Sequence, residues 1–326
     1  MKKKLEYILL AAVILAAGAY LMFRQADRTR YTLPKLPEMQ PGAVTRMEIT
    51  RKDRRIFLEK SNDGWRVSPG GFSADEKKVN DLLDALAKLI LSAQVSESKN
   101  YARYDLGEEK RIHVKTFAGK TLKRDLAIGS TASTFRHTHV KIAGDPHVYQ
   151  AQGNLKSKFN VTVEGLRDKT VLSFDPARVR EVLVTTEDTS VKIVKRTAPE
   201  TPSESGEKTQ GEKSPESKNK GVVWETEGGQ TVDSTKFMGV LSALSALECQ
   251  SYIDDRKKED FKDPSIEIVI RGEKEHVLKF FSPEKKDSRH RPGLSSDNPD
   301  PFLIADHQIQ DLQSFVKSLE PPEAAK

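Results

Sequence analysis

Apolar residues recur at helical spacing in two stretches of the chain, and each stretch follows a tryptophan. At i, i+3, i+4 and i+7 spacing they are Val79, Leu82, Leu83, Leu86, Leu89 and Ile90 in the first, and Phe237, Val240, Leu241, Leu244 and Leu247 in the second. The pattern predicts two amphipathic helices, each with one stripe to bury. Ser73 with Glu76 three residues later fits a capping box, and Asp233 is the expected N-cap of the second helix.

Short runs of alternating apolar and polar residues surround both helices, as is typical of strands with one face in water. In the first half of the chain the predicted strands are 44–50, 55–60, one at Trp65, 111–117, 121–128, 139–142 and 147–151, and Asn154 then begins a short helix. In the second half they are one at Trp224, 265–271, 276–281 and 302–305, before a closing helix with the apolar residues Ile309, Leu312, Phe315, Val316 and Leu319. The predicted fold class of this part of the chain is α+β, with antiparallel sheets and amphipathic helices.

The two halves match each other at one constant offset. Pro41 corresponds to Pro176, and further pairs are Val44 with Val179, Ile49 with Val184, Thr50 with Thr185, Ile56 with Val191 and Leu58 with Ile193. So many matches at one offset indicate an internal duplication. The match breaks at 197–220, a run rich in Glu, Lys, Ser, Pro, Thr and Gly that has too few apolar residues to fold. We expect a disordered insert there, which is either a tolerated loop insertion or a tether.

The N-terminus differs from the rest of the chain, because Lys2, Lys3 and Lys4 precede an apolar run from Leu5 to Phe23. At ~1.5 Å per residue this run is roughly 28 Å long as a helix, enough to cross the hydrocarbon core of a bilayer. An uncleaved transmembrane helix is the preferred interpretation. The alternative is a signal peptide cleaved after Ala17-Gly18-Ala19, although apolar residues continue past that point.

The lysines before the apolar run predict that the N-terminus stays inside. We therefore expect a single-pass protein of the bacterial inner membrane, in contact with the lipid bilayer and with its body facing the periplasm. The predicted organisation is a transmembrane helix at 1–24, a proline-containing stalk at 25–43, a first α+β unit at 44–174, and a second at 175–320 that includes the insert.

Composition and charge narrow the classes of function. The chain has 326 residues, of which 36% are hydrophobic and 31% charged, and this suits a hydrophilic folded body. Its 54 basic and 48 acidic residues are interspersed, so the net charge of +6 forms no basic stripe and nucleic acid is not an expected partner. Cys249 is the only cysteine, so no internal disulfide can form, and we expect it to be a small buried apolar residue on the second helix.

Three histidines are the best candidates for a metal site. His137 and His139 alternate along a predicted strand and so share a face, and His147 could approach from the paired strand. A solvated polar strand face explains the same residues, since no acidic or cysteine ligand accompanies them at a recognisable spacing. The sequence also lacks a nucleophile elbow, a phosphate-binding glycine loop and a His-Glu-x-x-His motif. We therefore assign no catalytic, cofactor-binding or metal residue.

Two further groups have both a functional and a structural interpretation. Trp65 and Trp224 could be exposed binding residues, but their matched places in a duplicated unit favour core packing. A basic cluster could contact anionic lipid or an acidic partner, but a solvated loop is the simpler interpretation; its residues are Lys285, Lys286, Arg289, His290 and Arg291.

Several short motifs carry a resemblance to a known family: Gly64-Trp65, Tyr104-Asp105-Leu106-Gly107, Leu126-Ala127-Ile128-Gly129, Val148-Tyr149 and Leu166-Arg167-Asp168-Lys169. With them, the chain resembles the DUF4340 family of bacterial envelope proteins. The resemblance implies an accessory role in ABC-type export systems related to gliding-motility components. The expected function is thus a membrane-anchored, non-enzymatic interaction protein that binds ABC-type permease and ATPase subunits. The alternative is an envelope hydrolase or metal-dependent enzyme.

Overall fold

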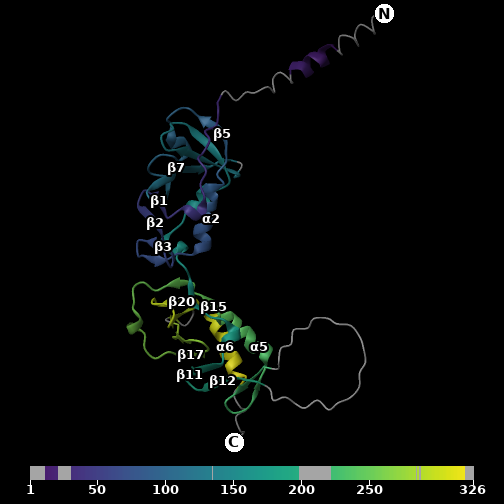
Figure 1. Cartoon of the computed structure of the whole chain (residues 1–326), viewed down its shortest axis with the longest axis vertical. Helices are drawn as coiled ribbons and strands as arrows, with labels where there is room; N and C mark the ends of the chain where they lie inside the picture. The colour runs from purple at the N-terminus through teal and green to yellow at the C-terminus, as the bar shows by residue number, and fades with distance from the viewer. Residues whose placement is uncertain are drawn as a thin grey trace, which may run out of the picture. The chain divides into compact units, whose positions relative to one another are not determined.

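The computed structural model describes residues 12–20, 31–133, 135–197, 222–283, 285 and 288–319 (Figure 1). The chain divides into two compact units, Met1–Asp168 and Lys169–Lys326. This division falls a few residues before the predicted boundary between 174 and 175. The predicted insert at 197–220 lies, apart from the backbone of Thr197, outside the described residues.

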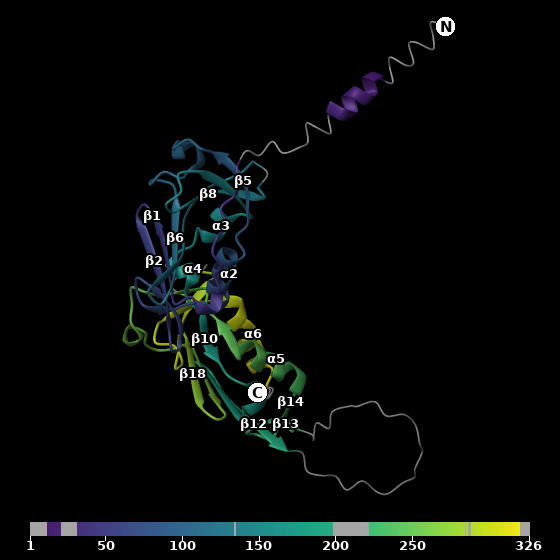
Figure 2. The same ribbon diagram turned by 45° about the horizontal axis from the view of Figure 1, so that its top comes forward.

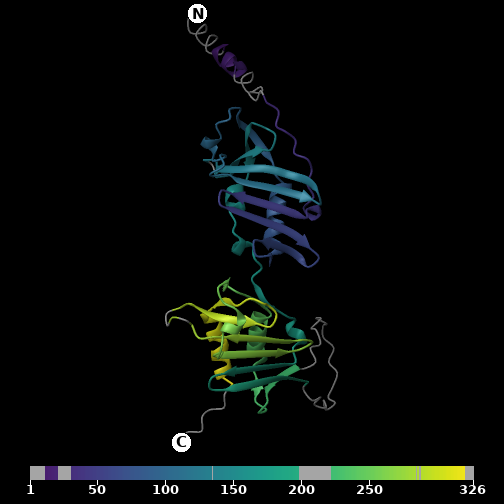
Figure 3. The same ribbon diagram turned by 90° about the vertical axis from the view of Figure 1, so that its left-hand side faces the viewer.

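The first unit is built on one sheet of nine strands. In chain order they are β1 (Arg46–Arg51), β2 (Arg54–Ser61), β3 (Gly64–Ser68), β4 (Phe72–Ser73), β5 (Leu91–Ser96), β6 (Ile112–Ala118), β7 (Thr121–Thr131), β8 (His137–Ile142) and β9 (Val148–Gln152). Their order across the sheet is β4-β3-β2-β1-β6-β7-β8-β9-β5 (Figure 3). All of these neighbours pair antiparallel.

Helix α2 (Glu76–Ala87) lies against one face of this sheet (Figure 1). Its predicted apolar stripe is buried at Val79, Leu82, Leu83 and Leu86. The predicted capping box is wrong, because Asp75 is the N-cap and accepts a hydrogen bond from the Lys78 amide at 3.1 Å. Ser73 ends β4, so the chain is still extended there. The helix also ends earlier than predicted, and Ile90 is 55% exposed.

The opposite face of the sheet carries a second, smaller apolar cluster. Leu106, Ala127 and Val148 are buried there, and Tyr104 packs against them. The chain that follows β5 covers them, including the 3-10 helix η2 (Tyr101–Tyr104). Gly129 permits this contact, since a Cβ atom at that position would lie 2.1 Å from the Tyr104 carbonyl oxygen.

Part of the predicted stalk belongs to the folded first unit. Met39 is buried in its core, and Leu33 packs against that core. The buried guanidinium of Arg124 donates hydrogen bonds to the carbonyls of Pro37 and of Leu86, so it links this segment to the end of α2. The unit then closes with α3 (Leu155–Phe159), which begins at Asn154 as predicted, and α4 (Val163–Leu166).

The second unit is also built on a sheet of nine strands. They are β11 (Glu181–Thr186), β12 (Ser190–Thr197), β13 (Val222–Thr226), β14 (Thr231–Val232), β16 (Ser251–Tyr252), β17 (Ile266–Arg271), β18 (Glu275–Phe280), β19 (His290–Ser295) and β20 (Phe302–Ala305). Their order is β14-β13-β12-β11-β17-β18-β19-β20-β16, again with antiparallel neighbours. A separate pair joins β10 (Thr170–Ser173) to β15 (Ala246–Glu248).

Two helices cover one side of this second sheet, α5 (Ser234–Leu244) and α6 (Asp306–Lys317) (Figure 1). Asp233 caps α5 as predicted, because its carboxylate accepts hydrogen bonds from the amides of Thr235 and Lys236. Cys249 is buried as predicted, but it follows β15 and is not on the helix, because α5 already ends at Leu244.

The two sheets have the same strand order, with β11 to β14 in the places of β1 to β4, β17 to β20 in those of β6 to β9, and β16 in that of β5. Pro41 and Pro176 each begin a 3-10 helix, η1 (Pro41–Ala43) and η3 (Pro176–Arg178). The offset that matches the prolines also matches buried residues on β2 and β12, Leu58 and Ile193. The units differ at their ends, where the second has the long helix α6 and the first has α3 and α4.

The predicted transmembrane helix requires a correction. Residues 12–20 are helical and reach only about 14 Å at 1.5 Å per residue, roughly half of a bilayer core. In the described part of the chain, no helix has both the length and the apolar character needed to span a membrane. The remainder of the predicted span, residues 5–11 and 21–23, lies outside the described residues. The prediction of single-pass placement in the inner membrane depended on that helix and is withdrawn with it.

Candidate functional site

The three histidines that were considered as metal candidates do not lie together. On β8 and β9, His137 lies opposite Gln152 and His139 opposite Gln150, whereas His147 precedes β9 at the turn of the hairpin. Three residues of strand, roughly 10 Å, separate the rows of His139 and His147. Within the described ranges, no group of three or more His, Cys, Asp or Glu side chains could hold a metal ion.

His139 has a structural setting in the first unit. Its Nδ1 atom lies 3.1 Å from the Ser130 hydroxyl and 3.0 Å from the Ser130 carbonyl oxygen. Its ring packs against Tyr104, with 4.9 Å between the ring centroids. Burial lowers the pKa of His139, and its hydrogen bond to Ser130 offsets this only in part, so the ring is neutral at pH 7.

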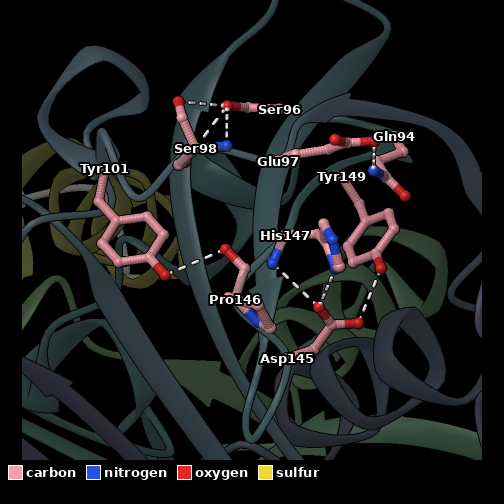
Figure 4. A network of polar contacts seen from close by, with 9 residues as sticks. All are labelled: Gln94, Ser96, Glu97, Ser98, Tyr101, Asp145, Pro146, His147 and Tyr149. Carbon is pink, nitrogen blue, oxygen red and sulfur yellow. Dashed lines mark hydrogen bonds and ion pairs between the residues drawn. The ribbon is translucent and has the colours of Figure 1, made fainter.

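His147 belongs to a polar network at the β8–β9 turn (Figure 4). One carboxylate oxygen of Asp145 accepts hydrogen bonds from the His147 amide at 2.9 Å and from its Nδ1 atom at 2.6 Å. The other accepts from the Tyr149 hydroxyl at 2.7 Å. Burial raises the pKa of Asp145, but these hydrogen bonds outweigh that effect and lower it overall. Burial and the contact with Asp145 raise the pKa of Tyr149 to about 12. Tyr149 is therefore no base at neutral pH, and the network fixes the turn.

The residues of the basic cluster at 285–291 do not share one environment. Lys286 lies outside the described residues. Arg291 is on β19 and buried, and its Nε and Nη2 atoms both lie 2.5 Å from the Asp306 carboxylate at the start of α6. Arg291 thus holds the closing helix and is not part of a solvated loop. Trp65 and Trp224 are both buried, each in the core of its own unit.

A cleft of about 330 Å³ in the second unit contains the arrangement nearest to catalytic chemistry. The Nδ1 atom of His276 lies 2.9 and 3.0 Å from the two carboxylate oxygens of Asp297, and Phe174 packs on the ring at 5.6 Å. The hydrogen bonds found for this ring both go to Asp297. An oriented histidine is present, but no hydroxyl or thiol among the described residues is hydrogen-bonded to it.

A more apolar groove of about 390 Å³ is lined by residues of α5 and α6 of the same unit. The ribbons of these two helices are labelled in Figure 2. Its lining is mostly apolar, with charged or polar residues at the margins: Lys236, Gly239, Val240, Ala243, Leu244, Leu247, Gln308, Ile309, Asp311, Leu312 and Phe315. The Phe237 and Phe315 rings stack at 5.8 Å, which sets the start of α5 beside the end of α6. The two helices therefore run in opposite directions along the groove.

The duplicated first unit provides an internal reference for this surface. When the N-caps Asp75 and Asp233 are aligned, the exposed α2 residues Asn80 and Asp81 correspond to Met238 and Gly239. Met238 is 38% exposed, and a Cβ atom at Gly239 would have no neighbour within 4 Å. These two exposed helix positions are thus polar in the first unit and apolar in the second.

The chain itself bridges the corresponding place in the first unit. Lys158 donates from Nζ to the Asp81 carbonyl at 3.3 Å, and Lys78 donates from Nζ to the Gly165 carbonyl at 3.0 Å. The segment that follows β9 therefore lies along α2. In the second unit α6 takes this place. Both units have a groove beside the matched helix, of about 370 Å³ in the first and about 390 Å³ in the second.

The face of the second sheet that points away from α5 and α6 is also less polar than the matching face of the first sheet. Leu183, Val269 and Val277 form a row across β11, β17 and β18, and all three are half-buried. The equivalent row of the first sheet is charged and consists of Glu48, Lys115 and Asp125. The predicted apolar stripe of the second helix is confirmed, because Phe237, Leu241, Leu244 and Leu247 are buried and Val240 packs against the same core. Sequence patterning did not single out the row on the outer face of the sheet, which comparison of the two copies position by position could have found.

One comparison with known proteins identifies the family. The model of the family described as "Domain of unknown function (DUF4340)" matches residues 65–264. The chain belongs to this family. The DUF4340 motif residues have structural roles here: Leu106, Val148 and Leu166 are buried, and the guanidinium of Arg167 lies 3.7 Å above the Phe72 ring. No curated protein and no solved structure matches the chain.

Proposed function

We propose that this DUF4340 protein is a non-enzymatic accessory subunit that binds other proteins through its second unit. The observation that carries the proposal is the apolar groove between α5 and α6, which Gly239 lines, together with the exposed Met238 that precedes Gly239 on α5. Glycine inside a helix costs about 1 kcal/mol relative to alanine, and Met238 exposes apolar surface on the same helix as the groove. Both features suit a helix whose outer surface is covered by a partner.

The partner class follows from the family resemblance. Proteins that resemble this chain in its motifs are associated with ABC-type export systems, so permease and ATPase subunits of such a system are the proposed partners. An accessory subunit needs a recognition surface and no reaction centre. The groove and the half-buried row of Leu183, Val269 and Val277 are both suited to that role.

The alternative is a hydrolase or metal-dependent enzyme, and the observation that favours it is the Asp297–His276 pair in its cleft. General-base catalysis by such a pair requires a nucleophile or water positioned on the second ring nitrogen. The groove has the more specific surface chemistry, and we therefore prefer binding over catalysis.

Co-purification of the full chain from native membranes and lysate, after mild chemical crosslinking, tests the proposal. The variant combines Met238→Asn with Gly239→Asp, which gives α5 the residues found at the matched places of α2. Asn80→Asp, which adds a charge to the outer surface of α2, is the control. Permease and ATPase subunits should accompany the wild type and the control but not the double variant. Their absence from the wild-type sample would refute the transporter assignment.

A further inference from the structure

We infer that the groove between α5 and α6 binds an amphipathic α-helix of the partner protein, about two turns of which fill it with apolar side chains. This inference rests on the proposed function and names the chemistry of the partner. The groove is bounded by two antiparallel helices, so its walls are two parallel ridges of side chains. A third helix laid along such walls buries apolar residues at i, i+3 or i+4, and i+7.

The dimensions of the groove fit a helix of this length. From Lys236 to Leu244 along α5 the rise is about 12 Å at 1.5 Å per residue, equal to roughly two turns. The volume of about 390 Å³ lies within the range of ordinary binding pockets and can take several apolar side chains. Gly239 lies on this surface with open space above it, and a small residue there lets a partner backbone approach closely.

Charged residues at the edge of the groove indicate which charges the two ends of the partner helix carry. Lys236 lies at the end of the groove formed by the start of α5 and the end of α6, and Lys317 ends α6 on the same side. Asp311 lies farther along α6 toward its start. An acidic residue of the partner near Lys236 and a basic residue near Asp311 complement these charges and fix the direction of binding.

The polar segments of this chain beyond the described residues do not supply such a helix. Residues 198–221 contain no Leu, Ile, Val, Met or aromatic residue, and residues 320–326 contain only alanine and proline as apolar residues. Neither segment carries an apolar stripe. These two segments are therefore not the occupant, and the complement that we propose for the groove is a helix of a different protein.

Synthetic helical peptides test the inference with the full-length protein. The first peptide carries leucines at i, i+4 and i+7, with Glu at one end and Lys at the other, and the second carries Lys at both ends. Fluorescence anisotropy should show that the wild type prefers the first peptide by about three- to fivefold, as expected for exposed ion pairs. Lys236→Glu should reverse this preference. Gly239→Asp should weaken both peptides at least about tenfold, because it places a carboxylate in the groove, and Asn80→Asp should leave both affinities unchanged.

Several outcomes would overturn the inference. The first is that the wild type and Lys236→Glu each bind the two peptides with equal affinity. The second is that Gly239→Asp binds both peptides as tightly as the wild type does. The third is that, in a competition assay with a fluorescent dye bound in the groove, dodecanoate displaces the dye but neither peptide does. Ala243 can also be replaced by a photo-reactive phenylalanine analogue. A crosslink from this position to a second copy of the chain, or to residues 5–23 of the same chain, would overturn the inference.

The two proposals can fail separately. If Gly239→Asp loses the co-purifying subunits while no peptide binds, the accessory function stands and the helical partner is wrong. If the peptides bind as expected while the double variant keeps its partners, the groove binds helices but is not the recognition surface for the transporter.

Discussion

Gly129→Ala should destabilise the first unit strongly, although it adds only one methyl group. Its Cβ would lie 2.1 Å from the Tyr104 carbonyl oxygen and 2.9 and 3.0 Å from side-chain carbons of Leu106. An ordinary carbon–oxygen contact is about 3.3 Å, so the covering segment must move by about 1 Å. Overpacking of this kind costs about 1–3 kcal/mol, and partial exposure of Leu106 adds about 1 kcal/mol. We expect a loss of about 2–4 kcal/mol.

The chain provides its own reporters for this measurement. It has two tryptophans, and Trp65 lies in the core of the first unit and Trp224 in that of the second. In a Trp224→Phe background, urea unfolding followed by fluorescence reports on the first unit alone. Gly129→Ala should lower its urea midpoint, whereas in a Trp65→Phe background it should leave the midpoint of the second unit unchanged.

Gly107→Ala is the matched control for Gly129→Ala. It lies in the same covering segment, and an added Cβ there would meet nothing within 4 Å. Its effect should remain within about 0.5 kcal/mol. Equal urea midpoints for the two alanine variants would refute the argument that close backbone approach makes glycine necessary at position 129.

Three further predictions use the same tryptophan reporters. Asp233→Ala removes the cap of α5 and should cost the second unit about 1 kcal/mol, and an unchanged Trp224 midpoint would contradict this role. Arg291→Met removes the cation beside the Asp306 carboxylate, which keeps only the hydrogen bond from Gln310, and should cost about 3 kcal/mol. Asp306→Asn should restore most of this loss in the double variant, and equal single and double variants would refute the pairing. The pKa of Tyr149 is about 12 in the folded protein, above the value of about 10 in an unfolded chain. Its contribution to the free energy of unfolding is therefore complete below pH 10 and disappears as the pH rises toward 12. Tyr149→Phe should therefore flatten the dependence of the first unit's midpoint on pH above about 10, and a slope as steep as that of the wild type would count against it.

The sequence predicted local structure well where one interaction decides it. Asp233 has the side chain that an N-cap requires and stands at the right position, and the structure confirms that it caps α5. At the first helix the same reasoning failed, because Ser73 is held in β4 and the Ala74 amide bonds to the Trp65 carbonyl at 2.8 Å. The pairing of β4 with β3 decided the position of the cap, and the residues around the cap contain no information about that pairing.

Surfaces were harder to predict than the core. Arg291 stood in a run of basic residues and looked solvated, but Asp306 neutralises it when β19 and β20 pair. Leu244 is buried as its spacing predicts, and Val240 packs against the same core. The groove that they form with Phe315 depends on where α6 lies, and their spacing contains no information about that. Burial depends on which elements meet, and that is a property of the whole unit.

The shared strand order shows which strands the residues matched by the family model would contain if they were cut out of the chain. The matched segment 65–264 begins within β3 and ends before β17, so it omits β1 and β2 of the first sheet and β17 to β20 of the second. It leaves β6 without its neighbour β1 and β11 without its neighbour β17. Because β11 corresponds to β1, joining β11 to β6 restores the complete order of nine strands. A fragment of residues 65–264 thus contains the strands of one hybrid repeat. We expect exchange of the first four strands between repeats to be a misfolding route of such a duplicated chain.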